Sequence, residues 1–325
     1  MPSKHKGINA PRLKTIYARQ AMPSWDKDYV PAILATPQEA PSISRAFILT
    51  PEKLQNREVH LLSTPERNAA LLGLYHPDVI GLQEQRMLSP EPCPHPLWTF
   101  PGMDRTGLPA VKGLIEVADR LGYLNLLTRV NVENKDDPSG NSSLVFPWVG
   151  DLLWAIRTAS GAIFNINWTV KSSYADFKRS LPKSKKKASD MVRVLARHEI
   201  EKALYDDVRI KTVQVADEGI DSHVVANLRQ LFGHHRRSLG LSVEQRTEIL
   251  HKFHSALGAG VPPVEVILQY SDRGRFTVHQ CRSLFYQGIW NRELRIDLFH
   301  PILINLPQRP EERDVVDVYA EWFKG

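Results

Sequence analysis

The segment from Asp151 to Lys171 constrains the fold of this chain most, because it predicts a β-hairpin. Its second arm alternates strictly between apolar and polar residues, the pattern of a strand in a sheet. Residues 158–161 (TASG) supply the turn. If Arg157 pairs with Ala162, Asp151 and Lys171 lie at the same end of the hairpin. The hairpin therefore brings one carboxylate and one ammonium group together.

This layout, an acidic residue that begins one strand and a lysine that ends the next, is typical of metal-dependent nucleases. Such a site needs carboxylates that hold Mg²⁺, for which Mn²⁺ would substitute, and a cation that stabilises charge on the phosphate. Glu66, near the start of a predicted helix, is the candidate for the second carboxylate. Glu66, Asp151 and Lys171 are thus the expected catalytic set. The hydroxyl of Thr169 and the backbone carbonyl of Val170 are expected to join Glu66 and Asp151 as metal ligands.

Each of these residues also has a structural interpretation. Asp151 is an acid in a turn before a strand, and Lys171 is the first charge of a basic segment that extends to residue 187. Glu66 follows Ser63 at the spacing of a helix capping box. A motif of this kind is therefore a hypothesis and not an assignment.

Composition favours a polyanionic partner and a reducing compartment. The formal net charge is +6, and basic groups attract phosphate. Cys93 and Cys281 lie far apart and form no zinc-binding spacing. The adjacent His234 and His235 would point in different directions on a helix, so we expect them on the surface. No segment approaches membrane-spanning length, so we expect a cytoplasmic protein.

The order of predicted elements indicates an α/β fold. A helix begins at Ser63, a strand covers residues 79–85, and the hairpin adds two strands. A helix over residues 184–205 and a strand over residues 209–216 follow. The order α-β-β-β-α-β with a mixed sheet is the core of the restriction-endonuclease-like fold.

We expect three regions along the chain. Residues 1–45 form an N-terminal basic arm whose first ten residues are poorly ordered. Residues 46–235 form the catalytic domain, with an insertion at about residues 88–148. Residues 236–325 form a C-terminal domain.

The C-terminal domain has a winged-helix-like pattern. Helices are predicted at residues 262–270 and 277–288, and a small β-wing at residues 293–297 and 302–305. A plain helical packing domain is the alternative. A last helix is expected over residues 312–324.

Several colinear segments resemble the TnsA family, the endonuclease subunit of heteromeric cut-and-paste transposases. Within residues 25–232, the similar segments are KDYVP at 27–31, PSISR at 41–45, VHLLS with Glu66 at 59–66, Glu84-Gln85, Asp151, and Thr169-Val170-Lys171. The family has glutamine where this chain has Thr169. The distance in sequence from Glu66 to Asp151 is longer than the resemblance leads us to expect and fits the insertion at 88–148.

The resemblance implies cleavage of double-stranded DNA at the 5′ ends of a transposon. A DDE-type transposase (TnsB) would cut and join the 3′ ends, and an AAA+ ATPase (TnsC) would couple the pair to a target. It also implies a bacterial protein that is associated with the nucleoid when bound to DNA. The alternatives are a free-standing restriction-like nuclease or junction resolvase, and a non-catalytic DNA-binding or partner-docking protein.

Overall fold

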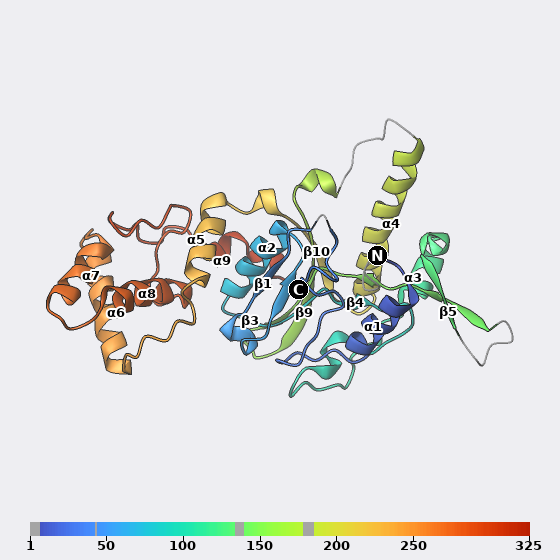
Figure 1. Cartoon of the computed structure of the whole chain (residues 1–325), viewed down its shortest axis with the longest axis horizontal. Coiled ribbons are helices and arrows are strands. Elements are labelled where there is room, and N and C mark those ends of the chain that lie inside the picture. The colour runs from blue at the N-terminus through green and yellow to red at the C-terminus, as the bar shows by residue number, and fades with distance from the viewer. Residues whose placement is uncertain (1–6, 43, 134–139, 178–184) are drawn as a thin grey trace. The chain divides into compact units, whose positions relative to one another are not determined.

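The computed structural model describes residues 7–42, 44–133, 140–177 and 185–325 (Figure 1). The chain divides into two compact units. The first comprises residues 1–69, 78–219 and 323–325, and the second comprises residues 70–77 and 220–322. The main change of unit thus falls after residue 219, earlier in the chain than the domain boundary expected after residue 235. None of the described helices is both long and apolar enough to cross a lipid bilayer.

A four-stranded mixed sheet forms the centre of the described part of the first unit. Its strands, in spatial order, are β3 (Val79–Glu84), β8 (Leu152–Arg157), β9 (Ile163–Lys171) and β10 (Lys211–Ala216). β3, β8 and β9 pair antiparallel, whereas β10 runs parallel to β9. The helices α2 (Thr64–Tyr75) and α4 (Lys185–Asp206) complete the order α2-β3-β8-β9-α4-β10. The predicted α/β class, mixed sheet and element order are therefore confirmed.

The predicted register of the hairpin is wrong by one residue. Arg157 pairs with Ile163 and not with Ala162. The reason lies in the turn, where Thr158 N donates to the carbonyl of Ala162 at 2.8 Å and Gly161 adopts a φ of 87°. Ala162 therefore closes the loop instead of pairing in the sheet. Asp151, just before β8, still lies at the same end of the hairpin as the last residue of β9.

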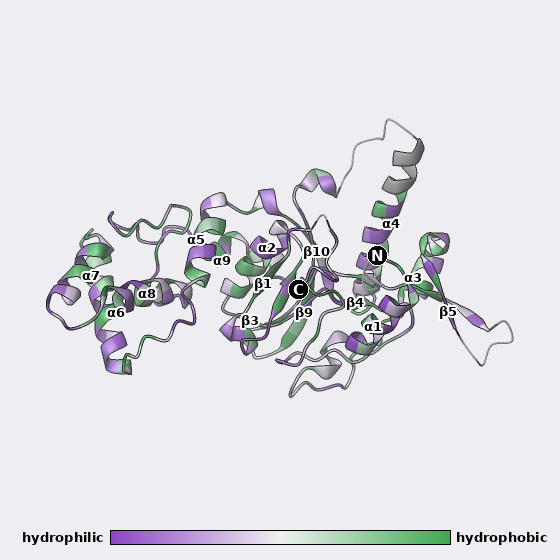
Figure 2. Cartoon of the chain, in the orientation of Figure 1, coloured by the Kyte–Doolittle hydropathy of each residue, from purple (hydrophilic) through white to green (hydrophobic). Residues whose placement is uncertain are grey.

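The two faces of the hairpin are both buried, but against different partners. On one face Trp154 and Trp168 meet edge to face at 5.4 Å between ring centroids, and Phe323 packs on Trp168 at 5.0 Å. On the other face Leu153 shares a buried cluster with Ile200 of α4. Figure 2 shows hydrophobic residues concentrated along the sheet strands, while the surrounding helices carry both colours. The sheet is therefore a core element rather than a surface one.

An N-terminal helix, which the sequence interpretation did not include, lies inside the expected basic arm. α1 (Ala10–Gln20) begins at Asn9, whose side chain accepts from Arg12 N at 2.9 Å. It buries Leu13 and Ile16 in a second cluster. Residues 1–6, part of the segment expected to be poorly ordered, lie outside the described residues. The arm is thus packed on the first unit from α1 onward.

Most of the predicted insertion is folded onto the first unit. α3 packs against α4, as Leu114 and Val117 share the buried cluster of Ile200. The remaining elements of this unit are β1 (Phe47–Leu49), β2 (Val59–Leu61), β4 (Met87–Leu88), α3 (Leu114–Arg120), β5 (Arg129–Glu133), β6 (Asn141–Val145) and β7 (Trp148–Val149).

The described part of the second unit is helical, and the expected wing strands do not form. Residues 293–297 contain only an isolated bridge between Ile296 and Pro310, and residues 302–305 are not a strand. The Asn227 side chain instead holds the loop between the two expected strands. Its amide donates to the carbonyls of Leu298 and His300, both at 2.8 Å. Its oxygen accepts from Ile302 N at 3.2 Å, so this N–H at the start of the second expected strand is bonded to a side chain and not to a partner strand.

The helices of the second unit are α5 (Ser222–Phe232), α6 (Val243–Gly258), α7 (Pro263–Asp272), α8 (Val278–Trp290) and α9 (Val315–Val318). α7 and α8 match the two predicted helices. The helix expected over residues 312–324 is instead the short α9 followed by a 3₁₀ turn over Ala320–Trp322.

The surface position expected for His234 and His235 is wrong. Both side chains are buried. The Nδ1 atom of His234 lies 3.1 Å from Ser283 Oγ, and the ring of His235 stacks on Phe232 with centroids 4.2 Å apart. Burial lowers the pKa of His234 to about 4. The pair is part of the packing of this unit.

Removal of one partner from a buried ion pair should destabilise the fold strongly. Arg57 donates to both Glu84 carboxylate oxygens at 2.9 and 2.8 Å, and both side chains are almost fully buried. Arg57→Met would leave a buried carboxylate without its counter-ion, so we expect a loss of about 3–5 kcal/mol in the free energy of unfolding, measured by urea denaturation.

The matched control is the double variant Arg57→Met/Glu84→Gln, which removes both charges and keeps an oxygen for His60 N. We expect it to be more stable than the single variant. A double variant as unstable as the single one would show that the charge is not the cause.

Candidate functional site

A polar cavity in the first unit is lined by four of the five residues selected from the sequence, among them the three expected catalytic residues. Glu66 of α2, Asp151 before β8 and Lys171 at the end of β9 all line it. The cavity has a volume of about 390 Å³. Its other lining residues are Ser63, Pro65, Val170, Ser172, Asp176 and Val194. Residues that lie far apart in the sequence therefore meet at one place.

Glu66 both supports the helix start and faces the cavity. Its backbone N–H donates to Ser63 Oγ at 3.2 Å, so the cap predicted from the sequence is present. Ser63 Oγ donates to one carboxylate oxygen at 2.9 Å. Leu62 N and Gln85 Nε2 donate to the other oxygen at 2.8 and 2.9 Å. The capping and site interpretations of Glu66 are thus compatible, and the carboxylate is held in one orientation.

Gln85 links the two carboxylate residues. Its side chain donates to Glu66, and its backbone N–H donates to the carbonyl of Asp151 at 3.0 Å. Gln85 has a φ of 48°, an unusual left-handed conformation for a residue other than glycine. A backbone outlier beside polar side chains is typical of functional sites. The sequence pointed to Gln85 only as part of a resemblance and predicted no role for it.

Asp151 and Lys171 each keep a charged group available. Asp151 Oδ2 accepts from Val170 N at 2.7 Å. Within the described residues Asp151 Oδ1 accepts no hydrogen bond, and Lys171 forms no ion pair. The site therefore offers a carboxylate oxygen and an ammonium group to a bound ion or substrate.

The electrostatics of the cavity favour a bound cation. Burial and then the charge of Asp151 raise the pKa of Glu66 to about 7. Two carboxylates close together repel each other, and a divalent cation between them would relieve this repulsion. Oxygen ligands from one or two carboxylates, completed by water, are the usual protein ligands of Mg²⁺. The described residues contain no group of three His, Cys, Asp or Glu side chains that could hold a metal. Glu66 and Asp151 therefore fit a magnesium ion that is largely hydrated.

Thr169 is not brought to the cavity. It shares a strand face with Lys171, but its hydroxyl lies 3.4 Å from Glu201 Oε1 and its side chain is buried. The cause is α4, which covers β9 at Thr169. On this face of the strand, the exposed part therefore begins at Lys171. The metal-binding role expected for the Thr169 hydroxyl therefore has no geometric support. Val170 does line the cavity, next to Asp151.

Sequence reasoning missed a buried carboxyl group close to the cavity, besides that of Asp176, which lines it. Glu201 of α4 is only 1% exposed and accepts from Asn167 Nδ2 at 2.9 Å. Burial raises its pKa, and the positive charge of Arg197 opposes this shift. The sequence offered one indication of this burial, because Glu201 lies on the apolar face of its helix, three residues before Leu204. Glu201 supports β9 from behind and does not line the cavity.

The comparisons with known proteins give no relative. A scan against models of protein families finds no match to this chain, and a search of curated proteins also finds none.

The raised pKa of Glu66 predicts how stability depends on pH. Without metal, the unfolded chain loses the Glu66 proton near pH 4.5, whereas the folded chain holds it to about pH 7. The folded state therefore binds more protons between these values, and its stability falls as pH rises through them. Glu66→Gln has no such proton, so we expect it to gain up to about 3 kcal/mol over wild type from pH 4.5 to pH 8.

Urea denaturation in EDTA at several pH values measures this difference. Glu116→Gln, a change at an exposed glutamate of α3, is the control and should follow the wild-type profile. Parallel pH profiles for wild type and Glu66→Gln would contradict the prediction.

Proposed function

We propose that this chain is a metal-dependent DNA endonuclease that acts as the TnsA-like subunit of a cut-and-paste transposase. The observation that carries the proposal is the meeting of Glu66, Asp151 and Lys171 in one cavity. Each comes from a different element of the core, and each was selected from the sequence for this chemistry.

The topology supports a restriction-endonuclease-like catalytic fold. The order α2-β3-β8-β9-α4-β10, with three antiparallel strands and a fourth parallel to the third, is that of its core. Fold alone does not determine activity, so the proposal depends on the site.

The side chains in the cavity suggest different roles in catalysis. Glu66 and Asp151 would hold Mg²⁺ or Mn²⁺, which supplies an activated water and a Lewis acid for phosphodiester hydrolysis. The donors Gln85 Nε2 and Val170 N orient the two carboxylates. Lys171 faces the same cavity without a carboxylate partner in the described residues and would stabilise negative charge that develops on the phosphate.

The resemblance to the TnsA family supplies the biological setting of the proposal. The substrate would be double-stranded DNA at transposon ends, cut on the 5′ strand. The partners would be a TnsB-type DDE transposase and a TnsC-type AAA+ ATPase, in the bacterial cytoplasm and at the nucleoid. The helical C-terminal region, which lacks the expected wing strands, exposes His279 and Arg282 on α8 for contact with DNA or a partner.

Cleavage assays test the catalytic set. The substrate is a 5′-labelled duplex that carries the element's own end, incubated with Mg²⁺ and the transposase encoded beside the chain. We expect Asp151→Ala and Lys171→Ala each to lose about a hundredfold or more in 5′-strand cutting. Lys202→Ala, a change at an exposed lysine of α4, is the control and should cut normally. Equal cutting by all variants would overturn the assignment.

Metal binding separates the two roles. By calorimetry with Mn²⁺, we expect Asp151→Ala to lose binding and Lys171→Ala to retain it, because only Asp151 offers oxygen ligands. Cutting of arbitrary DNA by the chain alone would favour a free-standing nuclease or junction resolvase. Absence of both metal binding and cutting in wild type would favour a non-catalytic DNA-binding or docking protein.

A further inference from the structure

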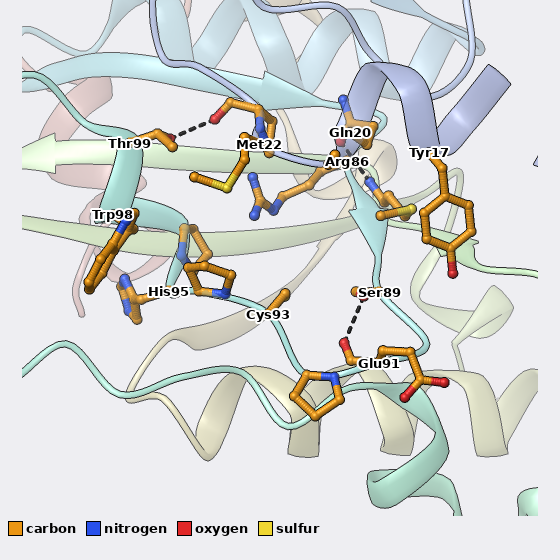
Figure 3. A pocket seen from close by; sticks show the side chains of 16 residues that line it. Tyr17, Gln20, Met22, Arg86, Ser89, Glu91, Cys93, His95, Trp98 and Thr99 are labelled. Carbon is orange, nitrogen blue, oxygen red and sulfur yellow. Dashed lines mark hydrogen bonds between the residues drawn. The ribbon is translucent and has the colours of Figure 1, made fainter. Parts of the chain in front are cut away.

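A second cavity of about 300 Å³ lies in the first unit and shares no lining residue with the carboxylate cavity (Figure 3). It is bounded by the C-terminal turn of α1, by β4 and by the proline-rich segment that follows β4. Neither the nuclease chemistry nor the resemblance assigns a role to it.

The distinctive residue of this cavity is Arg86. Its side chain is buried, with 8% of the residue exposed, and Figure 3 shows its guanidinium group reaching into the cavity. Nη1 donates to Gln83 Oε1. Within the described residues, Arg86 forms no ion pair, and its Nε and Nη2 atoms have no hydrogen-bond acceptor. A buried cation is therefore directed at an empty volume.

The neighbouring groups do not neutralise this charge. Gln83 is neutral, and its amide is held by the carbonyls of Pro23 and Ser24 at 3.2 and 2.7 Å. Glu84 is paired with Arg57. Glu91 lines the cavity but is exposed and takes part in none of the ion pairs of the described residues. A buried charge without a partner is costly, so the site is suited to an anion.

The other side chains define the anion further. Burial lowers the pKa of His95 to about 4 and raises the pKa of the Cys93 thiol, so both are neutral at pH 7. His95 Nδ1 already accepts from Leu97 N at 3.1 Å. Arg86 is therefore the single cation of the described lining, which suits a monoanion better than a phosphate dianion. Met22, Trp98 and several prolines line the remaining space and suit an apolar body.

We propose that this cavity binds a small monocarboxylic acid with an apolar or aromatic body, whose carboxylate is paired with Arg86. A planar carboxylate matches the edge of the guanidinium formed by Nε and Nη2, and can accept one hydrogen bond from each. The proposal stands independently of the proposed nuclease, and its test does not use cleavage.

The probe is 4-fluorobenzoate, titrated into the full chain and followed by ¹⁹F NMR. We expect saturable binding to wild type and a loss of about tenfold or more in Arg86→Met, because the charge-assisted hydrogen bonds are lost. Glu91→Gln should bind more tightly, since a repelling carboxylate is removed from the rim. 4-Fluorobenzamide and inorganic phosphate should each bind at least about tenfold more weakly than the benzoate. Equal binding of the benzoate and the benzamide would overturn the proposal.

Two further variants guard against misfolding of Arg86→Met. Ala21→Trp places a large side chain at an exposed position of the cavity wall, leaves Arg86 intact and should block binding. Arg129→Met removes an exposed arginine outside the cavity and should bind as wild type does. Undiminished binding to Ala21→Trp, or no binding of 4-fluorobenzoate to wild type at millimolar concentration, would refute the site.

Discussion

The short turn at Gln85 is the constraint on which the candidate site depends. Its backbone N–H fixes Asp151, and its side chain fixes Glu66, so one residue sets the separation of two carboxylates. It does this in a left-handed conformation that costs conformational energy. The surrounding sheet makes this possible, because β3 and β8 pair directly before the turn.

Residues 85 and 86 serve different cavities. Gln85 contacts the carboxylates, whereas the next side chain, Arg86, extends into the second cavity. In the first cavity the carboxylates of Glu66 and Asp151 lie close together. In the second, the guanidinium of Arg86 has no counter-ion among the described residues. Both arrangements weaken the folded state in the absence of ligands.

Much of the core could be predicted from the sequence because its signals are local. Alternation located β9, the hairpin pattern placed β8 before it, and a serine cap located the start of α2. The hairpin register was wrong because the loop hydrogen bond between Thr158 and Ala162 adds a residue to the turn. The wing was also wrong: the expected strands do not form, and the distant side chain of Asn227 holds the loop between them and the N–H of Ile302. Errors of this kind come from contacts between residues far apart in sequence.

The sequence by itself determined which residues could perform metal chemistry and the order of the elements that carry them. Glu66, Asp151 and Lys171 were selected from residue type, from their positions in a predicted helix and hairpin, and from a family resemblance. Only the tertiary structure decided that they line one cavity, that α4 and Glu201 cover Thr169, and that Arg86 is a buried cation. The physical reason is that burial and charge pairing depend on which elements pack together, and no local pattern in the chain encodes the packing of α4 over β9.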